Sequence, residues 1–67
     1  MVRYGNQIKK LRKQKGWTQD ELGKRAGVNQ RTISQIELNK GTSLATLTLL
    51  AEALGTNLAD LLKEDKE

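Results

Sequence analysis

A connection of only about three residues, Gly27, Val28 and Asn29, joins two short helical segments near the middle of the chain. The first segment starts at Thr18, and Asn29 is the cap at which the second begins. Two short helices joined so tightly must cross at a steep angle, and Gly27 can supply the positive φ that this turn requires. The whole sequence has 67 residues, which is enough for one small domain. The geometry of this pair of helices therefore constrains most of the fold of that domain.

The boundaries of both segments carry local signals for helix termini. Thr18 and Glu21 have the spacing of a capping box, in which each side chain satisfies an amide of the first turn. Asn29 is a favoured N-cap residue for the second segment. Apolar pairs with the spacing of a hydrophobic staple flank the two caps, namely Trp17 with Leu22 and Val28 with Ile33. The pair is therefore predicted to be a helix-turn-helix unit.

Apolar spacing and glycine positions extend this prediction to the whole chain. Gly16, Gly27 and Gly55 follow helical stretches, where a left-handed C-terminal cap favours Gly. We expect no strand and five helices, at about residues 4–15, 18–26, 29 to 37 or 38, 42 or 43 to 54, and from residue 57 onward. The expected inner faces are Tyr4, Ile8, Leu11; Leu22, Ala26; Ile33, Ile36; Leu44, Leu47, Leu50, Ala51, Leu54; and Leu58, Leu61, Leu62. The prediction is one all-α domain, residues 1–67, with an ordered core at 4–63 and a fraying charged tail.

Gly23 lies inside the first helix of the pair, where Gly costs about 1 kcal/mol relative to Ala. Two interpretations are open: a steric requirement for close approach of the second helix, or an unoptimised surface position. The steric interpretation is favoured, because Gly27 and both staples indicate the same geometry.

Composition removes several classes of function. The chain has no Cys and no His, which excludes thiol chemistry, Cys/His zinc sites and an imidazole base. No Gly-rich phosphate loop or paired nucleophile and base is visible, so we expect no enzyme activity, no cofactor and no metal. No apolar run is long enough for a membrane span or a signal peptide. We expect a cytoplasmic protein associated with the nucleoid.

Charge is distributed unevenly along the chain. The formal net charge is +4, but residues 1–40 hold ten basic and three acidic side chains, whereas residues 41–67 hold two basic and five acidic ones. A basic first part indicates a polyanionic partner, most simply a nucleic acid. Surplus Lys is also common on small soluble proteins, so charge alone does not decide the matter.

The stretch from Gln19 to Glu37 resembles the motif of phage-repressor/Cro-type (XRE family) helix-turn-helix regulators. Apolar or small residues stand where that family has them, at Leu22, Gly23, Ala26, Gly27, Val28, Ile33 and Ile36. The resemblance covers about residues 5–62 and implies a compact five-helix, lambda-repressor-like DNA-binding domain, with the helix-turn-helix at residues 19–38. One departure is the loop at residues 38–41, where many relatives have Asn-Gly.

Helical geometry separates the side chains of the second helix of the pair into two faces. Ile33, Ile36 and Glu37 cluster on one side; Gln30, Arg31, Ser34 and Gln35 lie on the other. Gln can bond N7 and N6 of adenine, and Arg can bond O6 and N7 of guanine. We expect Gln30, Arg31 and Gln35 to read bases, and Ser34 to contact a base or a phosphate. Asn29 resembles a family position that touches a base or the backbone.

Phosphate contacts are expected at the N-terminus of the first helix of the pair, where Thr18 and Gln19 lie. Asn39 and Lys40 are the next candidates. The resemblance also implies that Arg12 pairs with Glu37, which would fix the tilt of the reading helix and orient Arg12 toward a phosphate. Two independent surface charges are the alternative to this pair.

Two further expectations concern partners. A single small module contacts few base pairs, so we expect a weak homodimer, or one formed only on a palindromic duplex operator. Candidate interface residues are Leu38, Leu44, Leu49, Leu58, Leu61 and Leu62, unless they belong to the core. A protein-interaction module, such as a coactivator piece or an antitoxin, is the alternative to a repressor. The chain shows no extra tail long enough to neutralise a toxin.

Overall fold

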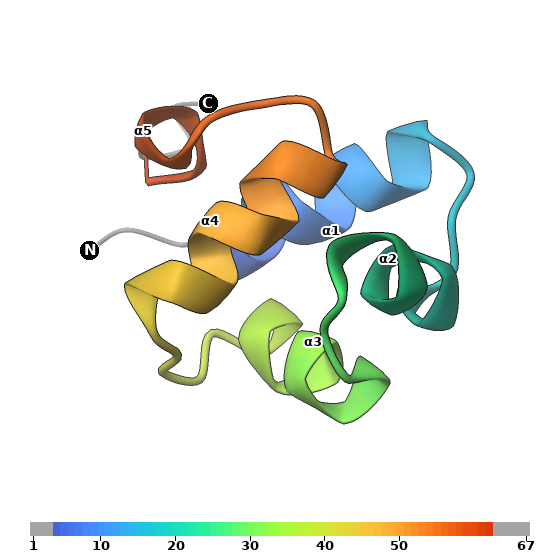
Figure 1. Ribbon diagram of the computed structural model, residues 1–67, viewed down its shortest axis with the longest axis horizontal. Helices are drawn as coiled ribbons and strands as arrows, with labels where there is room; N and C mark the ends of the chain where they lie inside the picture. The colour runs from blue at the N-terminus through green and yellow to red at the C-terminus, as the bar shows by residue number, and fades with distance from the viewer. Residues whose placement is uncertain (1–3, 63–67) are drawn as a thin grey trace.

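The computed structural model describes residues 4–62, and within that range the chain is all-α, with no strand (Figure 1). The five helices are α1 (Tyr4–Gln14), α2 (Gln19–Ala26), α3 (Gln30–Glu37), α4 (Leu44–Ala53) and α5 (Leu58–Leu61). The expected five-helix fold is therefore confirmed, although α5 comprises only four residues. Residues 63–67, the charged tail that was predicted to fray, lie outside the described residues. Residue 63 is also the last position of the expected ordered core. Within residues 4–62, no helix has the length and apolar character needed to cross a bilayer.

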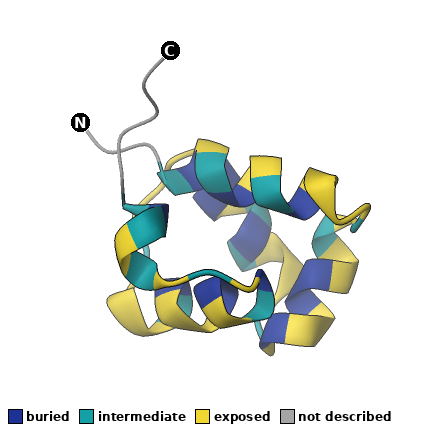
Figure 2. Ribbon diagram, turned by 90° about the horizontal axis from the view of Figure 1, so that it is seen from above, coloured by how far each residue is buried: buried dark blue, intermediate teal, exposed yellow. Residues whose placement is uncertain are grey.

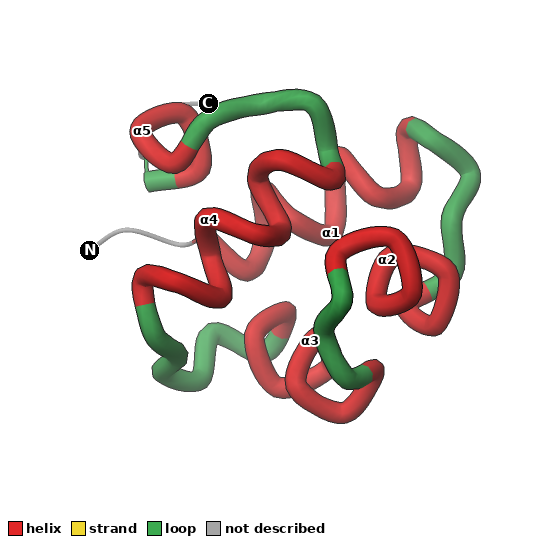
Figure 3. The backbone as a smooth tube through the Cα atoms, in the orientation of Figure 1, coloured by secondary structure: helices red, strands yellow, loops and turns green. Residues whose placement is uncertain are grey.

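The connection between α2 and α3 has the expected local chemistry. Glu21 N–H donates to Thr18 Oγ1 at 3.1 Å and Thr18 N–H donates to Glu21 Oε1 at 2.9 Å, so the capping box is confirmed. The pKa of the Glu21 carboxyl lies below its ordinary value, mainly because of its hydrogen bond with the Thr18 backbone N–H. The interaction with the Thr18 hydroxyl is the second largest cause. Gly27 ends α2 at φ +72°, and Asn29 Oδ1 accepts from Arg31 N–H at 2.8 Å to begin α3. Figure 3 shows how short this turn is.

The core lies where the inward faces of the helices meet, and the buried bands in Figure 2 mark these faces. Its buried apolar residues are Ile8, Leu22, Ala26, Ile33, Ile36, Leu47, Leu50, Ala51, Leu54 and Leu61. Leu44 was expected among them, but it is 63% exposed and that prediction is wrong. It is the first residue of α4, and the buried residues of that helix begin one turn later, at Leu47. Leu61 belongs to the core and is not available for an interface.

The steric interpretation of Gly23 is confirmed. A Cβ at this position would lie 2.5 Å from Val28 O and 3.3 Å from Ile33 Cδ1. The nearest obstacle is the backbone of the turn, and the side chain of α3 comes second. Gly23 therefore lets α2, the turn and α3 pack within van der Waals contact of one another.

The turn after α3 explains the departure from the Asn-Gly loop. Asn39 adopts φ +63°, its N–H donates to Ile36 O at 2.8 Å, and Lys40 N–H donates to Gln35 O at 3.0 Å. These two bonds are those of a Schellman C-terminal motif, in which the left-handed position is usually Gly and sometimes Asn. Asn39 thus takes the conformational role that Gly fills in many such turns.

Candidate nucleic-acid interface

The outer face of α3 carries a group of polar side chains. Gln30, Arg31 and Gln35 are exposed, and Ser34 is half-buried beside them. Within residues 4–62, no hydrogen bond or ion pair engages the side chains of Gln30, Arg31 or Gln35. The opposite face of α3 is anchored by the buried Ile33 and by its neighbours in the core. The helix therefore presents two amides and a guanidinium outward from a fixed backbone.

Asn29 stands at the N-terminal edge of this face. It is exposed, and its side-chain oxygen is already engaged by Arg31 N–H at 2.8 Å. Only the Nδ2 group is left to meet an outside acceptor, such as a base or a phosphate. Its cap orients the first turn of α3 whether or not it makes such a contact.

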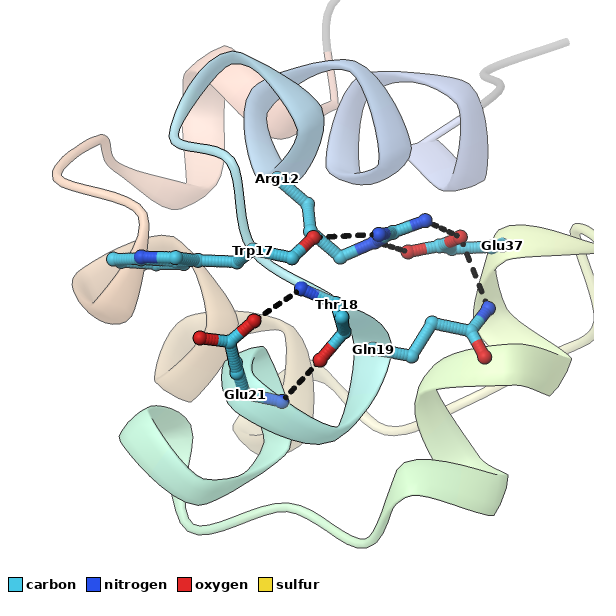
Figure 4. A network of polar contacts seen from close by, with 6 residues as sticks. All are labelled: Arg12, Trp17, Thr18, Gln19, Glu21 and Glu37. Carbon is cyan, nitrogen blue, oxygen red and sulfur yellow. Dashed lines mark hydrogen bonds and ion pairs between the residues drawn. The ribbon is translucent and has the colours of Figure 1, made fainter.

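Arg12 and Glu37 form a buried, two-pronged ion pair between α1 and α3 (Figure 4). Arg12 Nε donates to Glu37 Oε2 at 2.7 Å and Arg12 Nη2 donates to Oε1 at 3.1 Å. The two residues are only 8% and 9% exposed. Arg12 Nη1 also donates to Trp17 O at 2.7 Å, so the guanidinium links α1, α3 and the segment before α2. The other two of its five N–H groups make no hydrogen bond among residues 4–62.

The same carboxylate also orients Gln19 at the start of α2. Gln19 Nε2 donates to Glu37 Oε1 at 3.2 Å, and Figure 4 shows the amide turned toward Glu37, away from Glu21. Thr18 lies one residue earlier and uses its hydroxyl oxygen in the capping box. The link between Gln19 and Glu37 was not foreseen from the sequence, because it joins residues 18 positions apart on different helices.

Asn39 and Lys40 lie at the other end of α3, and both are exposed. Asn39 Oδ1 accepts from Gly5 N–H at 3.2 Å, and Lys40 O accepts from Tyr4 Oη at 2.8 Å. Sequence reasoning missed Gly5, although a Gly inside a predicted helix was the signal that identified Gly23. A Cβ on Gly5 would collide with Ile36 O and lie 2.7 Å from Asn39 Oδ1.

Three cations on α2 and in the turn after α1 contact other side chains of the domain. The Arg25 guanidinium lies 4.4 Å from the centroid of the Trp17 ring, and Lys15 Nζ lies 5.4 Å from it. Lys24 pairs with Asp20 at 3.3 Å on the exposed surface of α2. Cation–π contacts and exposed pairs of this kind contribute about 1 kcal/mol or less. Among residues 4–62, no cluster of His, Cys, Asp and Glu side chains has the make-up of a metal site.

Residues 8–61 of the chain match the family model described as HTH_3, helix-turn-helix. Antitoxin HipB of Escherichia coli O6:H1 is 46% identical over 50 residues, which are 73% of this chain and 53% of the relative. The chain thus spans about half the length of the curated antitoxins that it matches.

Solved structures show the same fold over nearly the whole chain. The N-terminal DNA-binding domain of SinR from Bacillus subtilis superposes with a TM-score of 0.87 and 35% identity, covering 96% of each chain. SinR, the master regulator for biofilm formation, solved in complex with DNA, gives a TM-score of 0.83 and 34% identity. That match covers 90% of this chain and 98% of the SinR chain.

Proposed function

The chain belongs to the HTH_3 helix-turn-helix family, and on that basis we propose that it is a sequence-specific repressor of transcription that binds duplex DNA. In this proposal α3 enters the major groove, and the protein acts in the cytoplasm, at operators on the nucleoid. The DNA-bound SinR structure supports the proposal by its matching fold. A domain seated on a promoter represses by occupying the DNA that the polymerase needs.

The observation that carries the proposal is the outer face of α3. Gln30, Arg31 and Gln35 project from a helix whose inner face is fully packed. The major groove admits an α-helix and displays a distinct pattern of donors and acceptors for each base pair. Because these side chains have no partners among residues 4–62, they can bond base edges without breaking internal bonds. Ser34 and Asn29 complete the face as shorter contacts.

Phosphate contacts flank α3 in this proposal. Thr18 and Gln19 lie at the N-terminus of α2, where free amides and the helix dipole favour an anion. Asn39 and Lys40 lie at the end of α3, and Arg12 would use its two remaining N–H groups. These contacts set the register on the duplex and make the affinity depend on salt.

Replacing Arg31 with Ala tests the assignment of base readers. If Arg31 bonds O6 and N7 of a guanine, the change costs about 1–3 kcal/mol of binding and relaxes the sequence preference at one base pair. Selection from a random duplex pool, followed by titrations of single-base variants of the selected site, measures both effects.

Lys24→Ala is the matched control, because it also removes one exposed cation but lies on α2 beside Asp20. The control is expected to keep the sequence preference of the unchanged chain. The assignment of Arg31 is wrong if Arg31→Ala retains the full preference at every position of the site, or if both variants behave alike.

The size of the domain supports the proposal of a homodimer on a palindromic operator. Its longest extent is 29 Å, whereas successive major grooves on one face of the duplex lie ~34 Å apart. One copy therefore cannot reach both half-sites. Leu44 and Leu49, exposed by 63% and 44%, are the apolar α4 residues available to join two copies. Of the other candidates, Leu38 is exposed and Leu58 and Leu62 are half-buried.

Sedimentation tests the dimer. We expect a largely monomeric free protein and two copies on one operator duplex, because the apolar area of three exposed leucines, Leu38, Leu44 and Leu49, is small for a stable interface. A single copy on saturated operator DNA would contradict this.

A protein-interaction module is the second candidate, favoured by the similarity to antitoxin HipB. That match covers 53% of the relative, so it does not carry over the activity of the whole antitoxin. Duplex binding whose logarithm falls steeply with the logarithm of salt concentration distinguishes a DNA reader from a module that contacts only proteins.

A further inference from the structure

The first turn of α1 is bonded to the turn that follows α3. Tyr4 Oη donates to Lys40 O at 2.8 Å, and Gly5 N–H donates to Asn39 Oδ1 at 3.2 Å. The bonded residues are 36 and 34 positions apart in sequence. The start of α1 and the end of α3, which Figure 1 colours blue and yellow-green, are thus tied at two points.

The approach of α1 to this turn is unusually close. A Cβ on Gly5 would collide with Ile36 O and come within 3.1 Å of Glu37 C. Only Gly lets the backbone of α1 reach the end of α3, and the Tyr4 hydroxyl then meets Lys40 O. The contact is therefore a built feature of the packing.

The backbone of Lys40 is held from two sides. Its N–H donates to Gln35 O at 3.0 Å, within the Schellman motif that Asn39 allows at φ +63°, and its carbonyl oxygen accepts from Tyr4. The Lys40 side chain remains exposed. Between residues 32 and 62 it is the only Lys or Arg in the sequence, so it is the one cation that the turn after α3 itself carries.

We propose that Tyr4 is a positioning residue for DNA binding, which acts through Lys40. Its hydroxyl fixes the Lys40 backbone so that the ammonium group meets the phosphate beside the C-terminal end of α3. A contact made from a fixed backbone loses less conformational entropy on binding than one made from a loose turn. This inference rests on the proposed function, because it needs a duplex in contact with α3.

Four variants of the full chain test the inference on the duplex selected for the unchanged protein. Tyr4→Phe removes only the hydroxyl, Lys40→Ala removes the cation and keeps the carbonyl, and a third variant combines both changes. Thr48→Val is the matched control, because it also deletes a hydroxyl that donates to a backbone carbonyl. That bond, to Leu44 O at 2.9 Å, lies on the exposed side of α4. Melting temperature is recorded beside the salt dependence of binding for each variant.

One phosphate contact changes the slope of log K against log [salt] by about 0.9, which is about eightfold in affinity at 0.1 M salt. Lys40→Ala is expected to show that full loss, and Tyr4→Phe a loss of about three- to eightfold with a flatter slope. The double variant should be no weaker than Lys40→Ala, because both changes remove the same contact. Thr48→Val should keep the slope of the unchanged protein whatever its melting temperature.

Three results would overturn the inference. The first is a Tyr4→Phe variant with the slope and affinity of the unchanged chain while Lys40→Ala loses its contact, which would make Tyr4 merely structural. The second is losses that multiply in the double variant. In both cases the proposed function stands. The third is an unchanged chain without salt-dependent duplex binding, which would overturn the proposed function and this inference together.

Discussion

Replacing Arg12 with Met is expected to lower the free energy of unfolding by about 3–5 kcal/mol. The change leaves the Glu37 carboxylate buried with only the Gln19 amide as a partner, and it also removes the donor to Trp17 O. An unpaired buried charge costs more than the ion pair itself contributes. A domain of this length is stable by about 3–10 kcal/mol, so urea denaturation should find the variant close to unfolding.

Lys24→Met is the matched control, because it breaks the ion pair with Asp20, whose two side chains are largely exposed. An exposed pair contributes about 0–1 kcal/mol, so this variant should unfold close to the unchanged chain. The double variant Arg12→Met/Glu37→Met should regain much of the lost stability, since no charge is left buried. Glu37→Gln keeps the shape of the side chain and is therefore the variant for measuring DNA affinity. If its melting temperature and its DNA affinity both stay unchanged, the ion pair of Arg12 and Glu37 has no role.

Replacing Gly5 with Ala is expected to cost about 3 kcal/mol, the upper end of the usual range for atoms added to a packed interior. The added Cβ meets a backbone carbonyl, Ile36 O, which cannot swing aside as a flexible side chain could. The α1 backbone must then move away from α3, which stretches the bonds made by Tyr4 and Gly5. A thermal scan should show a melting temperature lower by about 12–24 °C.

Gly41→Ala separates this steric effect from the general effect of replacing Gly. No atom lies within 4 Å of a Cβ at Gly41, and its φ is not positive. That variant should unfold within about 0.5 kcal/mol of the unchanged chain. Equal melting temperatures for the Gly5 and Gly41 variants would show that α1 does not depend on the close approach.

The features that could be predicted from the sequence are those whose causes are local. Thr18 and Glu21 cap α2 because they are three residues apart, and Gly27 ends it because one residue takes a positive φ. Gly23 could be interpreted in advance because its clash is with Val28 O, only five residues away. The buried stripe of α3 followed from helical periodicity, which needs no knowledge of neighbours. In α1 periodicity found Ile8, but Tyr4 and Leu11 are only half-buried, and Gly5 and Arg12 are the other buried residues.

The features that could not be predicted depend on how helices meet in space. Leu44 fits the apolar stripe of α4, but periodicity does not show how far along a helix its neighbours reach. The bonds from Tyr4 to Lys40 and from Gln19 to Glu37 join residues far apart in sequence, and no local pattern marks them. Asn39 was expected to contact phosphate, and the structure adds a bond from Gly5 N–H to Asn39 Oδ1, which still leaves the donor Nδ2 for that contact.

The candidate site also combines features that could be predicted from the sequence with features that could not. The outward direction of Gln30, Arg31 and Gln35 follows from the spacing of the core residues on the opposite face of α3. The resemblance to the helix-turn-helix family also implied the pair of Arg12 and Glu37, which holds α3 against α1 from one side. What the sequence did not show is that the contacts of Gly5 fix the C-terminal end of α3. A reading helix needs such support, because small displacements weaken every contact to a base edge.

The most direct measurement of the central claim is solution NMR of the chain bound to a duplex selected from a random pool. Side-chain amide and guanidinium protons of Gln30, Arg31 and Gln35 are the reporters. Intermolecular NOEs are expected from these protons to major-groove protons, such as cytosine H5 and the thymine methyl group. NOEs to DNA confined to the exposed lysines of α1, Lys9, Lys10 and Lys13, with the α3 side chains unchanged, would contradict it.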